Sequence, residues 1–169
     1  LANLSYPQSE KVIPSIVDLD GVVYKSNEEI PFTGKVSTFW ENNQLKEEGL
    51  YRNGQKSGLW KYWHREGQLS SKGIFRNSLK TGVWLEFYEN GNKKIQTIYR
   101  NGLKNGKQIN WTSDGKKISE FSFKSGNRSG SFKTWYENGR KKSTGSFING
   151  IEDGKIIEWY ENGQEYREQ

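Results

Sequence analysis

The chain has 169 residues, of which 31% are apolar and 14% aromatic, with 19 glycines and a formal net charge of +6. So few apolar residues exclude an ordinary compact domain built around a large aliphatic interior. The absence of cysteine excludes disulfides and thiolate metal sites, and no apolar run approaches the roughly 18 to 20 residues of a membrane-spanning helix.

Residues 1–18 contain Pro7 and Pro14 and lack the regular spacing found later, so we predict an extended N-terminal arm. Two lysines against five carboxylates give residues 1–33 a net charge of −3, which leaves +9 for the rest of the chain. The chain contains no Met, so we expect that a leader or anchor segment precedes Leu1 in the natural protein. Both a cytoplasmic and an exported location are compatible with this sequence.

Residues 19–33 predict a short capping hairpin. Val22-Val23-Tyr24 forms its first strand, residues 25–29 form a polar turn, and Ile30-Pro31-Phe32 leads into the next unit. Terminal units of repeat proteins differ from internal ones because they cover an end of the array.

A 24-residue repeat begins at Gly34 and runs to the C-terminus, so we assign residues 34–169 to one array. Its marker glycines recur without an insertion at Gly34, Gly58, Gly82, Gly106, Gly130 and Gly154. An aromatic residue stands five positions after each of them: Phe39, Trp63, Phe87, Trp111, Trp135 and Trp159. Another stands seventeen positions after the first five: Tyr51, Phe75, Tyr99, Phe123 and Phe147. Such a period indicates one supersecondary unit stacked on copies of itself.

Each unit divides into two strands and two turns. Residues 130–136 show the first strand most clearly, and Glu137-Asn138-Gly139 forms the turn after it. Asn-Gly is a strong hairpin signal because both residues tolerate positive φ. A second turn, such as Asn149-Gly150, closes the unit. Glycines and turn pairs follow one another too closely for helices.

Strand pairing accounts for the glycines. If the Asn-Gly turn is a two-residue loop, Trp60 lies opposite Gly73 and Gly58 lies opposite Phe75. We expect the rings to lie across these glycines and cover bare backbone. The sequence therefore predicts an all-β protein, an elongated single-layer antiparallel sheet of twelve strands that forms a solenoid-like ribbon of consecutive β-hairpins.

The run from Gly49 to Trp60, with Tyr51, Asn53-Gly54 and Gly58, resembles the core of a MORN repeat, as do residues 99–106 and 145–154. The turns in residues 135–139 and 159–163, both Trp-Tyr-Glu-Asn-Gly, resemble a bacterial MORN variant found in proteins labelled YwqK-type antitoxins. The resemblance covers roughly residues 22–165. It implies a bacterial hairpin array and either an antitoxin-like role or, as in eukaryotic MORN arrays, scaffolding and membrane attachment. The sequence departs from the pattern at Ser78, Thr97, Gln108 and Phe121, where we expect local irregularity.

We expect no catalytic residue, no cofactor and no metal site, and so no enzyme. The single histidine, His64, stands where other units have Tyr88 or Tyr136, and we interpret it as a replacement for that ring. Asp18 and Asp20 imitate the start of a calcium loop, but the ligands that should follow are missing. The glycine-rich turns precede no helix, which argues against a nucleotide site.

Aromatic residues occur at both strand parities, and a single layer cannot bury both faces, so we expect one aromatic row to remain partly exposed. The candidate aromatic row is Trp63, Phe87, Trp111, Trp135 and Trp159. The candidate basic contacts are Lys93, Lys94, Lys116, Lys117, Arg140, Lys141 and Lys142. Exposed rings flanked by cations are typical of protein interfaces.

The sequence therefore predicts a protein partner, with a toxin as one candidate, and an anionic membrane or cell-envelope polymer as the alternative. Rings and cations also stack single-stranded nucleic acid, but usually on a closed barrel or a four-stranded platform, so we favour protein. A third interpretation is that the lysines only keep exposed strands soluble.

Overall fold

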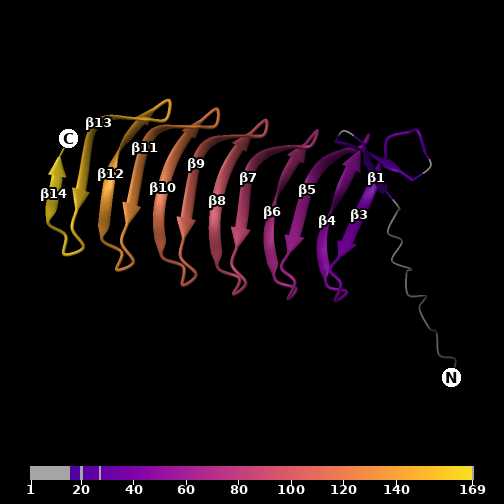
Figure 1. Cartoon of the computed structure of the whole chain (residues 1–169), viewed down its shortest axis with the longest axis horizontal. Helices are drawn as coiled ribbons and strands as arrows, with labels where there is room; N and C mark the ends of the chain where they lie inside the picture. The colour runs from indigo at the N-terminus through magenta and orange to yellow at the C-terminus, as the bar shows by residue number, and fades with distance from the viewer. Residues whose placement is uncertain (1–15, 20, 27, 169) are drawn as a thin grey trace, which may run out of the picture.

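A computed structural model describes residues 16–168 except Asp20 and Asn27. The described residues form fourteen strands and no helix, and Figure 1 shows them as hairpins laid side by side along the long axis of the molecule. The strands are β1 (Ile16–Leu19), β2 (Val22–Lys25), β3 (Gly34–Phe39), β4 (Leu45–Arg52), β5 (Gln55–Trp63), β6 (Leu69–Arg76), β7 (Leu79–Phe87), β8 (Lys93–Arg100), β9 (Leu103–Trp111), β10 (Lys117–Lys124), β11 (Asn127–Trp135), β12 (Lys141–Ile148), β13 (Ile151–Trp159) and β14 (Glu165–Glu168).

Strands β3 to β14 form one twelve-stranded sheet in which every strand pairs with its sequence neighbours, all antiparallel. This confirms the predicted single-layer ribbon of consecutive hairpins. At the N-terminal end, β1 and β2 form a separate two-stranded hairpin. The second strand expected near Ile30 is reduced to a single bridge between Tyr24 and Pro31, and the hairpin forms instead with residues assigned to the arm. Most of the predicted arm lies outside the described residues.

The turns at the lower edge of Figure 1, which follow β3, β5, β7, β9, β11 and β13, are three-residue loops. In the first, the amide of Trp40 donates to the Gln44 carbonyl (2.8 Å) and only Asn43, the last loop residue, has positive φ. The expected two-residue loop is therefore wrong at this edge. The predicted register is nevertheless correct beyond the loop. One residue of the second strand, Lys46 in the first unit, forms a bulge, and this extra residue compensates for the longer loop.

The turns at the upper edge, which follow β4, β6, β8, β10 and β12, are two-residue loops with positive φ at both residues, as at Asn53 (48°) and Gly54 (72°). This is the turn for which Asn-Gly is suited. Each upper turn is joined to the preceding one by backbone bonds, such as the Gly102 amide to the Lys80 carbonyl (2.9 Å).

The marker glycines allow a second bulge, because Gly58 has φ of 70°, which glycine adopts readily. A Cβ at Gly58 would meet nothing within 4 Å, so no ring covers this residue. Between the pairs Leu50↔Ser57 and Glu48↔Lys61, three residues of β5 oppose Gly49 alone. The marker glycines after Gly34 are thus needed for backbone conformation, and the expectation that rings cover Gly58 is wrong.

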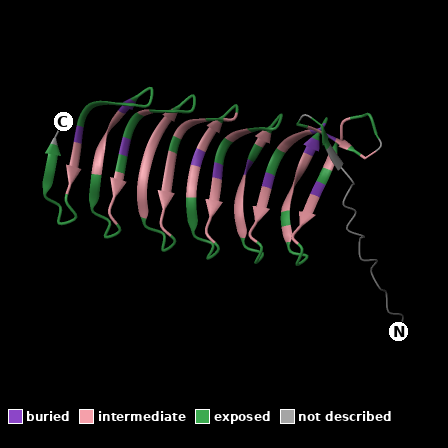
Figure 2. Cartoon of the chain, in the orientation of Figure 1, coloured by how far each residue is buried: buried purple, intermediate pink, exposed green. Residues whose placement is uncertain are grey.

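Rings do cover the other set of glycines, which gives the sheet its buried face. A Cβ on Gly49 would lie 2.2 Å from the Trp60 ring, and one on Gly73 would lie 2.2 Å from the Trp84 ring. Trp60 is fully buried and Trp84 is nearly so, and Figure 2 shows buried residues in the middle of the strands. Trp60 lies opposite Gly73 as predicted, but its ring covers Gly49 on the other neighbouring strand, because the bulge at Gly58 turns it that way. We call this side the core face.

Edge-to-face contacts run along the core face through Tyr51, Trp60, Phe75, Trp84 and Tyr99, with ring centroids 4.9 to 6.4 Å apart. Lys56 and Lys80 extend over these rings, with Nζ 3.8 Å from the Trp60 centroid and 4.2 Å from that of Trp84.

The aromatic ladder is interrupted after Tyr99. Gln108 occupies the position of Trp84, its Oε1 is buried without a hydrogen-bond partner, and it lies beside the buried Thr97. Phe121, opposite Gln108, supplies a ring from the second strand instead and stacks on Phe132 at 5.6 Å and 9°. The expected irregularity is therefore a change of side chains, and the strand pairing continues through it.

Candidate interaction surface

Strand alternation places the predicted aromatic row on the face opposite the core. In β5 the rings of Trp60 and Tyr62 stack on the core face, so Leu59, Lys61 and Trp63 point the other way. We call this second side the outer face. No second layer of described residues covers it.

The aromatic row stands at the lower ends of β5, β7, β9, β11 and β13, and all five rings are half-buried. Lysines of the preceding hairpin extend over three of them, with Lys93 Nζ 5.9 Å from the Trp111 centroid, Lys117 Nζ 5.5 Å from that of Trp135 and Lys141 Nζ 5.7 Å from that of Trp159. Rings and ammonium groups therefore alternate along the lower outer face.

The other predicted basic residues do not join this row. Lys94 and Lys142 are the bulge residues of their strands and contact the rings of Tyr88 (5.4 Å) and Tyr136 (5.6 Å). Lys116 pairs with Asp114 (3.0 Å) within a lower turn. Arg140 lies in the next lower turn, where its Nη1 donates to the Glu161 carbonyl (3.1 Å).

Sequence reasoning missed a row of aliphatic residues on the outer face, nearer the upper turns than the aromatic row. Leu59, Ile74 and Val83 are 51%, 47% and 48% exposed. Leu59 pairs with Ile74, and Val83 pairs with the half-buried Ile98. The signal was present in the alternation, since these apolar residues have the opposite parity to the ladder rings.

A family model described as MORN repeat variant matches residues 32–53, 56–77, 80–101 and 128–149, just over half of the chain. The chain belongs to this MORN family. The match omits residues 104–125. In this unit of the MORN array Gln108 stands at the repeat position of Trp84, and Phe121 stands at the repeat position of Gly73. MORN repeats are generally associated with protein or membrane interaction. No curated protein matches the chain.

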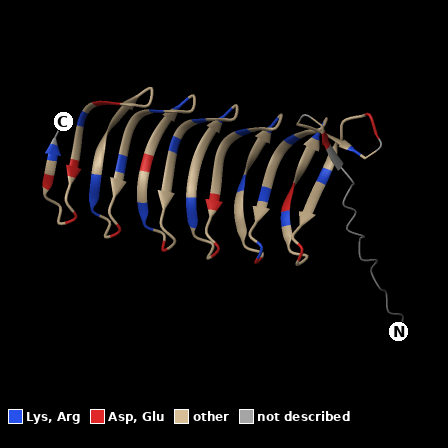
Figure 3. Ribbon diagram, viewed as in Figure 1, with Lys and Arg blue, Asp and Glu red and all other residues tan. Residues whose placement is uncertain are grey.

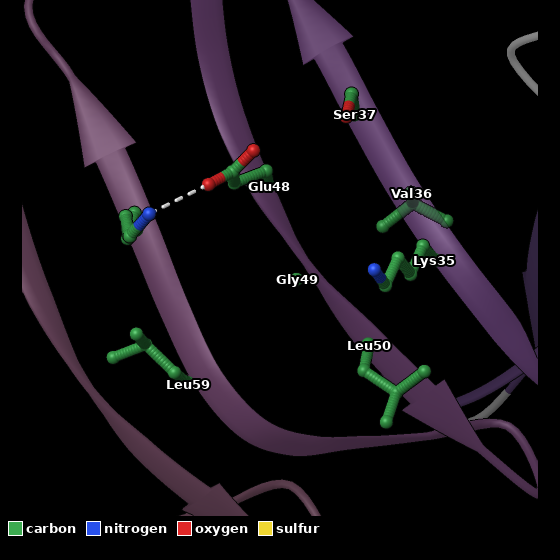
Figure 4. A pocket seen from close by; sticks show the side chains of 8 residues that line it. Lys35, Val36, Ser37, Glu48, Gly49, Leu50 and Leu59 are labelled. Carbon is green, nitrogen blue, oxygen red and sulfur yellow. Dashed lines mark hydrogen bonds and ion pairs between the residues drawn. The ribbon is translucent and has the colours of Figure 1, made fainter.

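The MORN array has a shallow hollow on its outer face at the first bulge, of about 210 Å³. Its outer-face lining comes from Lys35, Ser37, Glu48, Leu50, Leu59 and Lys61. Figure 4 shows the ion pair between Glu48 and Lys61 (3.0 Å) across β4 and β5, with Leu50 and Leu59 at the other end of the hollow.

Charges of both signs lie along the MORN array. Figure 3 shows Lys or Arg along most strands, and Asp or Glu in the lower turns and on several strands. On the outer face, Glu120 lies between Lys107 (2.6 Å) and Lys117 (3.2 Å). The hydrogen bond from Lys107, against a smaller opposing effect of burial, lowers the pKa of Glu120.

Side chains at the lower edge join four MORN units to the next one, whereas Thr112, at the equivalent position, bonds to Lys116 of its own turn. Trp40 Nε1, His64 Nε2, Tyr88 Oη and Tyr136 Oη each lie 2.7 to 3.2 Å from a carbonyl 23 residues further along, at Trp63, Phe87, Trp111 and Trp159 respectively. His64 thus takes the position of the tyrosines, as predicted. In the part of the chain that the structure describes, no group of three or more His, Asp or Glu residues is placed to hold a metal. No helix there is long and apolar enough to cross a bilayer.

Proposed function

We propose that this MORN array is a non-enzymatic interaction module that binds a protein partner along its outer face. The observation that carries the proposal is that the aromatic row, its lysines and the aliphatic row all stand on one face, where the rings are only half-buried and the aliphatic side chains are exposed. Aromatic and aliphatic anchors beside cations are the side chains that supply most binding energy in protein interfaces.

Affinity capture from the native source, with the outer face altered, tests this proposal. A Trp111→Ser/Trp135→Ser variant should lose a partner that the unaltered chain retains at 0.5 M salt, because contacts made by buried rings are screened little. The matched control is Tyr160→Ser, which removes a 54% exposed ring outside the aromatic row and should keep the partner. Far-ultraviolet circular dichroism checks that all three chains are folded. Equal capture of the partner by all three chains would contradict the proposal that it binds the outer face.

A second candidate function is attachment to an anionic membrane or polymer, and the row of Lys93, Lys117 and Lys141 supports it. Sedimentation with vesicles of phosphatidylglycerol and phosphatidylcholine tests it. Binding by the lysines should weaken steeply between 0.05 and 0.5 M salt and on replacing the three by glutamine. Vesicle binding that is unaffected by salt and by the glutamine replacements would exclude this mechanism.

An antitoxin role is a narrower form of the first proposal, and the Trp-Tyr-Glu-Asn-Gly turns at Trp135 and Trp159 support it. A captured partner that arrests growth when expressed alone, and does not when expressed with this chain, is the expected result. Growth arrest that persists on co-expression would remove the antitoxin interpretation and leave the interaction module.

A further inference from the structure

The aliphatic row of the outer face is not required by the fold. We define the aliphatic patch as Leu50, Leu59, Ile74, Val83 and Ile98, on β4 to β8. The same two positions of the repeat are polar further along the sheet, as Lys107, Ser122, Ser131, Ser146 and Lys155 on β9 to β13. The backbone pairing is equivalent in both places. Half of the array therefore exposes aliphatic side chains at positions where the other half folds with serine and lysine.

The patch is continuous because its members are neighbours across the strands. Leu59 and Ile74 are directly paired, as are Val83 and Ile98. Leu50 and Leu59 line the hollow at the Gly58 bulge, so the patch opens into a concave site at its N-terminal end (Figure 4). Exposed apolar surface in one contiguous patch is characteristic of a binding site.

Cations surround the patch. Lys35 lies opposite Leu50, and Lys72 lies opposite Leu85 on one side and Lys61 on the other. Lys61 is paired with Glu48, whereas Lys35 and Lys72 form no ion pair with any described residue. Two ammonium groups are thus left to interact with an acidic partner at the margin of an apolar surface.

We propose that the aliphatic patch and its hollow bind a segment of a protein partner in which apolar side chains alternate with Asp or Glu. This inference rests on the proposed function, because it names the chemistry of the partner. The apolar side chains would cover Leu59, Ile74 and Val83, and the carboxylates would pair with Lys35 and Lys72. A polypeptide suits the site better than lipid, since the hollow contains the Glu48–Lys61 ion pair, which a peptide backbone can hydrogen-bond and an acyl chain cannot.

Selection from a phage library of random 16-residue peptides tests the proposal with the whole chain as target. Peptides that alternate apolar and acidic residues should be enriched. Their affinity, measured by fluorescence anisotropy, should fall at least tenfold for Leu59→Ser/Ile74→Ser/Val83→Ser and several-fold for Lys35→Glu/Lys72→Glu. The first variant carries at three positions the residue that Ser122 and Ser131 already place in the same sheet, so it should fold.

Two control variants keep the result specific. Ile148→Ser/Ile151→Ser removes side chains that are 55% and 75% exposed at an upper turn, and Lys133→Glu reverses an exposed charge on β11. Neither should change peptide affinity by more than twofold. Enrichment of basic peptides, or selected peptides that bind all variants equally, would overturn the proposal that the aliphatic patch binds an acidic segment.

The test separates this inference from the proposed function. If the partner captured on the aromatic row binds the triple serine variant as well as the unaltered chain, the patch proposal fails and the interaction module stands. If phosphatidylglycerol vesicles bind, and the triple serine variant abolishes that binding while no acidic peptide is selected, the patch is a membrane contact and the protein proposal for it is wrong.

Discussion

The two halves of the twelve-stranded sheet share one backbone and differ in their side chains on both faces. In β4 to β8 the core face carries an unbroken aromatic ladder and the outer face carries the aliphatic patch. In β9 to β13 the ladder is interrupted at Gln108, and the patch positions hold serine and lysine. The backbone is therefore determined by turns, bulges and the pairing of large with small residues, while the outer face is free to vary and to carry function.

The strongest test of this comparison is a double-mutant cycle that rebuilds the second half inside the first. Gly73→Thr places a side chain where the Trp84 ring lies 2.2 Å away and should cost about 3 kcal/mol, and Trp84→Gln should cost about 3 to 5 kcal/mol. Together they recreate the pair Thr97 and Gln108, so the combined loss in urea unfolding should be about 1 to 3 kcal/mol smaller than additive.

The cycle has an internal control. Trp60 is the cross-strand partner of Gly73 but its ring covers Gly49, so coupling between Gly73→Thr and Trp60→Gln should be much weaker. Strictly additive losses for the Gly73 and Trp84 pair would show that large and small residues are not matched across the hairpins.

Alkaline pH should destabilise the first half, where Tyr51, Tyr62 and Tyr99 lie. Burial, and next the Glu47 carboxylate, raises the pKa of Tyr51 to about 12, and burial also raises the pKa of Tyr62 and Tyr99. Because the folded pKa of Tyr51 exceeds the unfolded value of about 10, its contribution of roughly 2 to 3 kcal/mol is present below pH 10 and lost as the pH rises to 12.

Urea unfolding of the unaltered chain and of Tyr51→Phe between pH 9 and 12 measures this loss. The variant should lose less stability over that range, and Phe123→Tyr offers a comparison at the same repeat position of the second half. Identical pH profiles for the unaltered chain and Tyr51→Phe would contradict the assignment.

The lower-edge contacts between units predict a smaller effect. Tyr88→Phe removes the hydroxyl that donates to the Trp111 carbonyl (2.8 Å) and should cost about 1 kcal/mol in urea unfolding. Tyr160→Phe removes a hydroxyl from a 54% exposed ring and should cost much less. Equal losses would mean that these hydroxyls do not join the units.

The smallest expected effect concerns acid and the second half. Because Lys107 lowers the pKa of Glu120, its contribution is present above the unfolded value of about 4.3 and is lost as the pH falls through the folded value. Glu120→Gln should cost less than about 1 kcal/mol at pH 7 and nothing at pH 2.5, since Lys107 is largely exposed to solvent. Chemical unfolding at the two pH values measures the difference, and a loss that persists at pH 2.5 would contradict it.

The repeat and its register were predictable because their signals are local. The 24-residue spacing, the upper Asn-Gly turns and the alternation in β5 identify the hairpins and both faces, and the pair Trp60↔Gly73 forms as predicted. The three-residue lower loops were missed because Asn138 does not adopt positive φ there; instead its Oδ1 accepts from the Arg140 amide (2.9 Å). The compensating bulge kept the register correct although the loop was wrong.

The candidate surface was predictable only in part. Lys93 and Lys94 are adjacent in sequence, but the bulge at Lys94 sends one to the outer face and the other to the ring of Tyr88. A run of basic residues therefore gave no indication of which cations stand together. The alternation indicated the face on which Leu59 and Val83 lie, but their exposure depends on what the neighbouring strands cover, and the sequence does not show this.

The sequence by itself determined the array of hairpins, since its spacing and turn residues act within a few positions of the chain. The tertiary structure alone decided which ring covers which glycine, because the bulge at Gly58 turns Trp60 toward Gly49 and only the packing between hairpins selects that direction. It also decided which side chains remain exposed on the outer face, because exposure depends on what neighbouring strands cover.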